Sequence, residues 1–226
     1  MKNLKIIKFP RFIALLFATL FSVNLAFVEV SGGFVGFGVG VGTNYAKIIN
    51  NQGIHSLNHT FGGMKGSYGF VLGYKQFFTR YLGLRYYASV DTTYGSTDTF
   101  GGSGKFKIHA IGYAANIDFM GNFVSTKSVD FGAFVGFGFG AMSWRSKMLQ
   151  SHYATTIGKS PNSTGFDAPI NAGLRVNFAH YHGIELAIRW HFLTTRFIDY
   201  YESETMKWRF DLGQSFSLLL RYTASF

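Results

Sequence analysis

The chain has 226 residues, of which 47% are hydrophobic and 19% aromatic, but only 14% are charged. Soluble domains carry roughly 25% charged residues, so the composition disfavours an ordinary soluble protein. Outside the N-terminus no apolar run reaches the roughly 18 residues that a membrane-spanning helix needs, which excludes a bundle of such helices. The chain has no cysteine, so disulfides give no information about its compartment.

The N-terminus has the pattern of a bacterial secretory signal. Four basic residues among the first eleven precede an apolar run over 12–28, and a basic segment followed by a short apolar segment is typical of such signals. We expect cleavage after Ala26, which divides the chain into a signal peptide, 1–26, and a mature protein, 27–226. Cleavage lowers the formal net charge from +10 to +6 (10 − 4). The alternative is a retained anchor helix.

Eight segments of the mature chain alternate apolar residues with small or charged ones. Successive side chains of a strand point to opposite faces, so each segment has one apolar face rich in Phe and Tyr. Strands of about ten residues, apolar outside and polar inside, are typical of a transmembrane β-barrel, and lipid cannot satisfy an open sheet edge. We therefore predict an all-β fold, an eight-stranded antiparallel transmembrane β-barrel. The apolar rows lie within 35–41, 68–74, 82–90, 111–119, 129–139, 168–178, 184–192 and 210–226.

The connections between these rows alternate in length. The long ones are 46–64, 94–105, 143–165 and 193–208, and the short ones are 77–81, 120–128 and 179–183. Outer-membrane barrels have short periplasmic turns and long outer loops, so both termini are expected on the periplasmic side of a bacterial outer membrane. Aromatic residues near the row ends predict two interfacial girdles. The periplasmic girdle is Phe77, Phe78, Tyr81, Phe119, Phe123, Phe178 and Tyr181, and the outer one is Tyr45, Tyr94, Trp144, Phe192 and Trp208.

Two glycine-rich segments, "FVGFGVGVG" at 34–42 and "FVGFGFG" at 134–140, place glycines on the inward face of the first and fifth strands. These strands occupy opposite walls of an eight-stranded barrel, whose interior is only wide enough for side chains to fill. We interpret the bare walls as space for lumenal side chains, including Phe134. The alternative is that the glycines permit the strands to bend.

The same alternation places six acids and six bases inside the barrel. Hydrogen-bonded ion pairs persist in a narrow lumen, whereas isolated charges are costly there, so we expect a closed lumen with a neutralised charge network. An ion path through this network is the alternative. The predicted members are Lys75, Arg85, Asp91, Asp118, Asp130, Asp167, Arg175, Glu185, Arg189, Arg209, Asp211 and Arg221.

The C-terminal quarter carries a family resemblance. The segments "NAGLRVNFAHYHGIELAIRWHF" and "RFDLGQSFSLLLRYTASF" at 171–192 and 209–226 resemble the C-terminal barrel region of the Helicobacter outer membrane protein family. The Phe-Val-Gly opening after the signal resembles the mature N-terminus of that family. The resemblance implies an outer-membrane barrel, a porin in some members and an adhesin in others. This chain lacks the large extracellular insertions of the adhesive members, so no specific activity is transferred.

The last strand ends on an aromatic residue with apolar residues alternating back from it. This pattern resembles the C-terminal signal by which the barrel-assembly machinery recognises its clients, which makes that machinery an expected partner during biogenesis. The alternative is an ordinary last strand. The predicted assembly signal is Leu218, Leu220, Tyr222, Ala224 and Phe226.

Enzymatic and cofactor sites are weakly supported by the sequence. Seven scattered histidines without cysteine make no metal set, and the glycine runs lack the phosphate-loop pattern. Lipid-modifying barrel enzymes need a histidine paired with a serine, and His109 has no serine two residues away. We therefore expect no enzyme and no cofactor, but a closed barrel with a structural or surface-interaction role. A small porin is the main alternative and a lipid-modifying enzyme the lesser one.

The expected outer loops carry more bases than acids. Cations at this level are suited to the phosphates of lipopolysaccharide, so outer-membrane lipids are the expected partners rather than nucleic acid. A ligand on the host surface remains an open alternative, and the sequence does not identify one.

Overall fold

The computed structural model describes residues 29, 31–52, 55–98, 105–147, 150–151, 161–179, 181–203 and 206–226. The predicted signal peptide, 1–26, and its cleavage site lie outside these residues. Among them, no helix is both long enough and apolar enough to cross a membrane.

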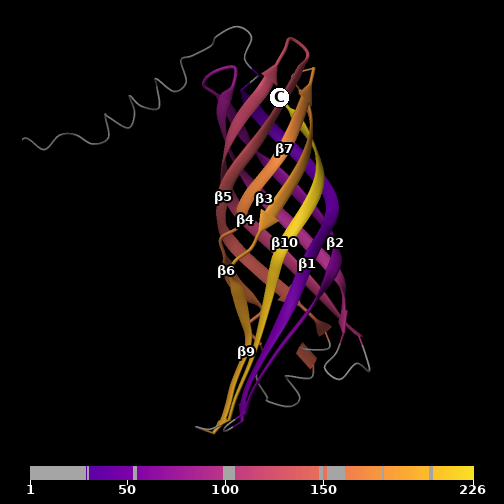
Figure 1. The fold of residues 1–226 in the computed structure, drawn as a ribbon, viewed down its shortest axis with the longest axis vertical. Helices are drawn as coiled ribbons and strands as arrows, with labels where there is room; N and C mark the ends of the chain where they lie inside the picture. The colour runs from indigo at the N-terminus through magenta and orange to yellow at the C-terminus, as the bar shows by residue number, and fades with distance from the viewer. Residues whose placement is uncertain are drawn as a thin grey trace, which may run out of the picture.

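The described chain is almost entirely β-structure wound into one elongated barrel (Figure 1). The ten strands are β1 (Gly32–Gln52), β2 (His55–Phe77), β3 (Leu82–Asp98), β4 (Lys105–Ser125), β5 (Val129–Arg145), β6 (Thr164–Asp167), β7 (Ile170–Phe178), β8 (His182–Trp190), β9 (Thr194–Ser203) and β10 (Met206–Ser225). Neighbouring strands pair antiparallel, and β1 pairs with β10 from Phe34↔Ser225 to Gln52↔Met206. This last pairing closes the sheet, so the barrel has no free edge along these strands.

Two of the walls are interrupted strands, so the ring contains eight walls rather than ten. Both β6 and β7 pair with β5 in one continuous register, and the break at Ala168–Pro169 falls at a proline, which has no N–H to donate to a ladder. In the same way, β8 and β9 pair with successive parts of β10. The predicted eight-stranded antiparallel barrel is confirmed, with β6–β7 and β8–β9 each serving as one wall.

The apolar rows face outward, as predicted. Phe37, Phe70 and Phe139 are at least half exposed, whereas the alternating residues beside them are buried or half-buried. A large exposed apolar band on a closed barrel is what a lipid-facing surface requires. The glycines of β1 and β5 point inward on opposite walls of the ring, also as predicted.

The strands extend well beyond the apolar rows at one end of the barrel. The connections expected over 46–64 and 193–208 are instead long hairpins, in which β1 continues to Gln52, β2 begins at His55, and β9 pairs with β10. Backbone pairing in a hairpin does not require apolar alternation, so the row pattern could not show these extensions. We call this end the hairpin end. The other, the short-turn end, holds the turns after β2, β4 and β7 and the C-terminus (Figure 1).

A β-bulge in β10 reverses the inside–outside assignment near the hairpin end. Thr43 lies opposite Phe216 while Asn44 lies opposite Gln214, so Ser215 is an extra residue in β10. An extra residue inverts the alternation that follows it. Leu212, expected on the lipid face, is therefore fully buried inside the barrel.

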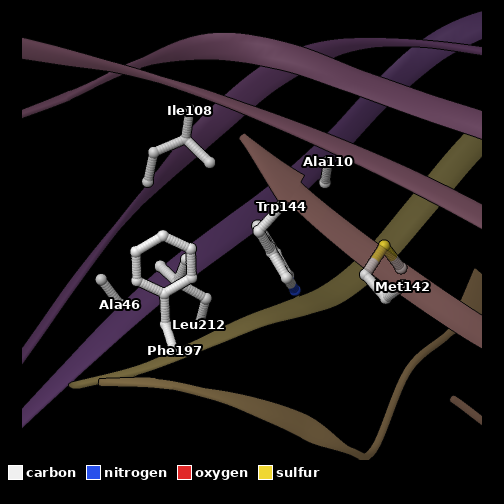
Figure 2. Packing of buried hydrophobic residues seen from close by; sticks show 7 residues of the cluster. All are labelled: Ala46, Ile108, Ala110, Met142, Trp144, Phe197 and Leu212. Carbon is white, nitrogen blue, oxygen red and sulfur yellow. The ribbon is translucent and has the colours of Figure 1, made fainter. Parts of the chain in front are cut away.

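Inside the barrel, toward the hairpin end, lies an apolar cluster (Figure 2). It consists of Ala46, Ile108, Ala110, Met142, Trp144, Phe197 and Leu212, and we refer to these seven residues as the apolar cluster. Trp144 was expected in the outer girdle but is 1% exposed here, with its Nε1 donating to Thr195 Oγ1 at 3.0 Å. Phe77, assigned to the other girdle, is likewise buried inside, against Met120 and Phe134.

Candidate functional site

The lumen between the short-turn end and the apolar cluster is filled by charged side chains that join opposite walls. β3 and β8 are four places apart in the ring of eight. Arg85 of β3 donates through Nη1 to Glu185 Oε1 of β8 at 2.5 Å and through Nε to Asp118 Oδ2 at 2.8 Å. Arg221 Nη1 lies 3.3 Å from the other Glu185 oxygen. Glu185 thus sits between two guanidinium groups, and all four residues are buried.

A second pair joins the same two walls closer to the apolar cluster. Arg189 of β8 forms an ion pair with Asp91 of β3. The same guanidinium donates to Asn171 Oδ1 at 2.7 Å, to Ser89 Oγ at 2.9 Å and to Asn116 Oδ1 at 3.0 Å. A buried charge is tolerated when it has both an opposite charge and hydrogen-bond partners for its remaining donors. Here Asp91 supplies the opposite charge, and neutral side chains from three strands accept the remaining hydrogen bonds.

At the short-turn end, Glu29 provides a lumenal acid that the alternation did not predict. It precedes β1 and is 2% exposed. Its carboxylate accepts from Lys75 Nζ at 2.8 Å, from Arg175 Nη1 at 3.1 Å and from Asn177 Nδ2 at 2.6 Å. Lys75 on β2 and Arg175 on β7 occupy opposite walls, so Glu29 bridges them. Because Glu29 lies before the first alternating row, the only sequence signal for it is an acid at the third position after the expected cleavage site.

The electrostatics of Glu29 follow from these contacts. Burial by itself would raise the pKa of this carboxyl, but the adjacent Arg175 and Lys75 outweigh burial and hold the pKa below its ordinary value of 4.5. Glu29 is therefore ionised at neutral pH and neutralises the two bases that face it.

The other predicted network residues are distributed differently. Asp130 accepts from Ser125 Oγ at 2.6 Å, and Asp167 pairs with His191 Nδ1 at 2.8 Å. Arg209 and Asp211 pair with each other at 2.7 Å, and Asp211 is buried while Arg209 is half-buried. Beyond the bulge both have the opposite parity to the lumenal Leu212. They are not part of the lumenal network, because the extra residue Ser215 inverts the alternation on which their assignment rested. We use the name charge network for Glu29, Lys75, Arg85, Asp91, Asp118, Arg175, Glu185, Arg189 and Arg221.

Glycines let these polar side chains lie close to the opposing strands. A Cβ on Gly138 would collide with Asn116 Oδ1, and one on Gly136 would collide with Asp118 Oδ1. A Cβ on Gly69 would meet Asp91 Oδ1 in the same way. The inward glycines therefore make the room that the charge network occupies.

Little space remains between the lumenal side chains. Phe134 packs inside the barrel with its ring 4.0 Å from the Arg85 guanidinium, a cation–π geometry. Two interior cavities between these residues have volumes of about 10 Å³ each, about the space of one water molecule. Along the barrel axis, the charge network and then the apolar cluster occupy the lumen in series.

The predicted assembly signal lies on the outer face of β10. Leu220, Tyr222 and Phe226 are exposed, and Leu218 and Ala224 are half-buried. Phe226 is 71% exposed, and its N–H donates to the Gly33 carbonyl at 2.9 Å. The terminal ring is thus presented at the seam where the first and last strands meet.

Within the described ranges, no group of three or more histidine or acidic side chains is arranged to hold a metal ion.

Comparison with known proteins adds to this geometry. A family model described as Helicobacter outer membrane protein matches residues 69–226, more than half of the chain. The chain belongs to this family. It is an integral β-barrel protein of the outer membrane, as the resemblance of its C-terminal quarter predicted.

The comparison with solved structures supports the barrel fold through one of them. The chain is similar to the outer membrane protein OprG of Pseudomonas aeruginosa, with 12% identity, a TM-score of 0.57, and coverage of 88% of this chain and 99% of OprG. It is also similar to neisserial surface protein A, at 14% identity and a TM-score of 0.43, covering 87% and 98% of the two chains. The outer membrane protease OmpT of Escherichia coli is similar at 8% identity and a TM-score of 0.41, covering 90% and 99%. No curated protein matches the sequence.

Proposed function

We propose that this outer-membrane barrel is closed to ions and solutes, and that its role lies in its surfaces rather than in transport through its lumen. The observation that carries the proposal is that the charge network and the apolar cluster fill the lumen one after the other along the barrel axis. An ion moving along the axis would have to displace buried ion pairs and then pass a packed apolar cluster that offers it no polar partner. Either barrier alone disfavours conduction.

The proposed orientation places the short-turn end in the periplasm and the hairpin end outside. The short turns, the start of β1 and the C-terminus share one end of the barrel, while the β1–β2 and β9–β10 hairpins extend from the other. Outer-membrane barrels have short periplasmic turns and longer extracellular segments, which supports this direction. The hairpins then form the surface available to partners outside the cell.

The proposed role is not enzymatic. The Asp167–His191 pair has the geometry in which a carboxylate orients a general base, and it is the best candidate for catalysis. Both residues are buried in the lumen, and among the described residues no nucleophile is hydrogen-bonded to His191 Nε2. We therefore assign a structural role to the hydrogen-bonded contact between these two side chains.

Single-channel recording of the purified, refolded protein in planar bilayers tests the proposal. We expect no stable conductance from the wild-type protein. A large and steady conductance would overturn the closed-lumen proposal and favour a small porin.

A further inference from the structure

A polar pocket lies on the outer face of the barrel near the hairpin end. It has a volume of about 980 Å³ and lies against β4, β5 and the start of β6, beside the helical turn that follows β5. In this turn the Gln150 N–H donates to the Ser146 carbonyl at 3.0 Å. Its strand residues Lys107, Ser143 and Arg145 have the parity of the outer face, and the buried Trp144 and Ser146 complete the lining on the side of the barrel wall.

The pocket is cationic. Lys107, Arg145 and Lys147 line it, and among the described residues no carboxylate does. All three bases are exposed, and none forms an ion pair with a carboxylate that the structure describes. Their charges are therefore available to an anion from outside the chain.

Neutral hydrogen-bonding groups line the same pocket or lie next to its lining. Ser143 Oγ and Thr164 Oγ1 are 2.8 Å apart, and Tyr113 Oη lies 3.3 Å from Ser143 Oγ. His109 is directly opposite Arg145 in the β4–β5 register, and its Nε2 lies 2.6 Å from Thr92 Oγ1. Hydroxyls beside Arg and Lys are the combination that binds the oxygens of a phosphate.

The position of the pocket matches the boundary of the lipid-facing surface. Below it on the same outer face, Tyr113, Ile117 and Phe139 are exposed apolar residues. The outer face becomes polar and basic at Ser143 and Arg145, where the apolar row ends. A lipid whose chains lie against the apolar rows would bring its headgroup to the level of the pocket.

We propose that this pocket binds the phosphorylated headgroup of an anionic membrane lipid. Arg145 and Lys107 contact the phosphate, Ser143 and Thr164 donate hydrogen bonds, and Lys147 covers the site from the helical turn. With the orientation given under Proposed function, the lipid belongs to the outer leaflet, where the phosphorylated glycolipid is lipopolysaccharide. The binding chemistry itself does not depend on that orientation.

Binding to the purified, detergent-solubilised protein tests the proposal. Native mass spectrometry and the shift of the thermal unfolding midpoint are measured with lipopolysaccharide, with a zwitterionic phosphatidylcholine and with inorganic phosphate. We expect lipopolysaccharide to bind and to raise the midpoint, phosphatidylcholine to have little effect, and phosphate alone to bind far more weakly because it lacks the chains. Equal effects of phosphate and lipopolysaccharide would overturn a lipid site in favour of a simple anion site.

Double variants test whether lipopolysaccharide binds at this pocket. Lys107→Ala combined with Arg145→Ala should weaken lipopolysaccharide binding at least about tenfold, since two charge-assisted contacts are lost. The matched control is Arg80→Ala combined with Lys127→Ala, which removes two exposed bases from the turns at the opposite end and should leave binding unchanged. An equal loss in both double variants would mean that net charge alone attracts the lipid, and an unchanged affinity in the pocket variant would contradict the site. Lipid binding to the detergent-solubilised protein depends neither on conductance nor on orientation in a membrane. Failure of this test is therefore distinguishable from failure of the closed-lumen proposal.

Discussion

At the scale of single residues, the inward glycines of β5 are required for close approach rather than for an unusual backbone. Gly138 faces Asn116, whose Oδ1 accepts from both Asn171 Nδ2 and Arg189 Nη2 at 3.0 Å. A side chain at Gly138 would displace this amide and with it the hydrogen bonds around Arg189. Glycine on a strand commonly marks such an approach.

Leucine at these glycines should destabilise the barrel. Gly138→Leu collides with Asn116, and Gly38→Leu places a Cβ 3.2 Å from the Leu220 carbonyl oxygen, so each should cost about 1–3 kcal/mol or more by overpacking. Ala133→Leu on the outward row of the same strand as Gly138 should be tolerated, because lipid yields to it. Urea midpoints of the three variants refolded into vesicles measure the difference. If Ala133→Leu proved the most damaging, the inside–outside assignment would be wrong.

Glu29 is the residue whose removal should most disturb the short-turn end. Glu29→Ala leaves Lys75 and Arg175 buried without their shared acid, and breaking a buried pair in this way costs about 3–5 kcal/mol. Asp199→Ala is the control, because its partner Arg196 is 53% exposed and Asp199 is itself only partly buried, and ion pairs open to solvent contribute about 0–1 kcal/mol. Equal unfolding midpoints for the two variants would contradict the bridging role of Glu29.

The same residue should contribute to acid sensitivity. Its pKa is lowered in the folded protein, so the ion pairs contribute fully above the ordinary value of 4.5 and lose that contribution as the pH falls through the lower folded value. Glu29→Gln cannot titrate. Its stability should therefore fall less than that of the wild type between about pH 7 and about pH 3, as measured by urea midpoints, and an equal or steeper fall would count against this assignment.

At the scale of strands, the sequence pattern is sufficient to predict the eight walls of the barrel but not where each wall ends. Alternation with a period of two predicts all eight walls because lipid demands an apolar outer row and the narrow lumen a polar inner one. The same pattern fails beyond the bulge at Ser215, where Leu212 faces the apolar cluster instead of lipid. Trp144 is misassigned for a related reason, since an apolar residue suits either a lipid interface or an interior cluster. Glu29 was missed because it lies outside any strand.

The final strand carries an assembly prediction. Phe226 is highly exposed at the seam between β1 and β10, where it is accessible to a partner during insertion. Phe226→Asp should lower the amount of protein in the outer membrane and increase its degradation in the periplasm, as followed by fractionation and immunoblotting. Phe123→Asp is the control, because Phe123 is also a highly exposed aromatic near the short-turn end. Unchanged levels of Phe226→Asp would mean that this residue is not the recognition signal.

At the scale of the whole molecule, the proposed orientation of the barrel can be tested by antibody labelling of intact cells. An epitope inserted between Gln52 and His55, at the hairpin end, should be labelled by an antibody added outside. The same epitope inserted beside Lys127, in the turn between β4 and β5, should be labelled only after the outer membrane is permeabilised. The reverse pattern would show that the barrel is inserted in the opposite direction.

The closed lumen depends on two fillings in series, and this arrangement makes a specific prediction for variants. Arg189→Ala removes cross-lumen contacts from the charge network, and Trp144→Ala removes the largest side chain of the apolar cluster. Either variant leaves the other filling in place, so each should show at most brief openings. The double variant should open more often and for longer than either, while Lys127→Ala, an exposed base in a turn, should behave as the wild type.

Single-channel recording of the refolded wild-type protein beside these variants is the most direct measurement of whether the barrel is closed. A silent wild type, with openings that appear on removing one filling and increase on removing both, is the result predicted by the filled lumen. A steady wild-type conductance that Arg189→Ala and Trp144→Ala leave unchanged would contradict it, because ions would then cross by a route that neither the charge network nor the apolar cluster blocks.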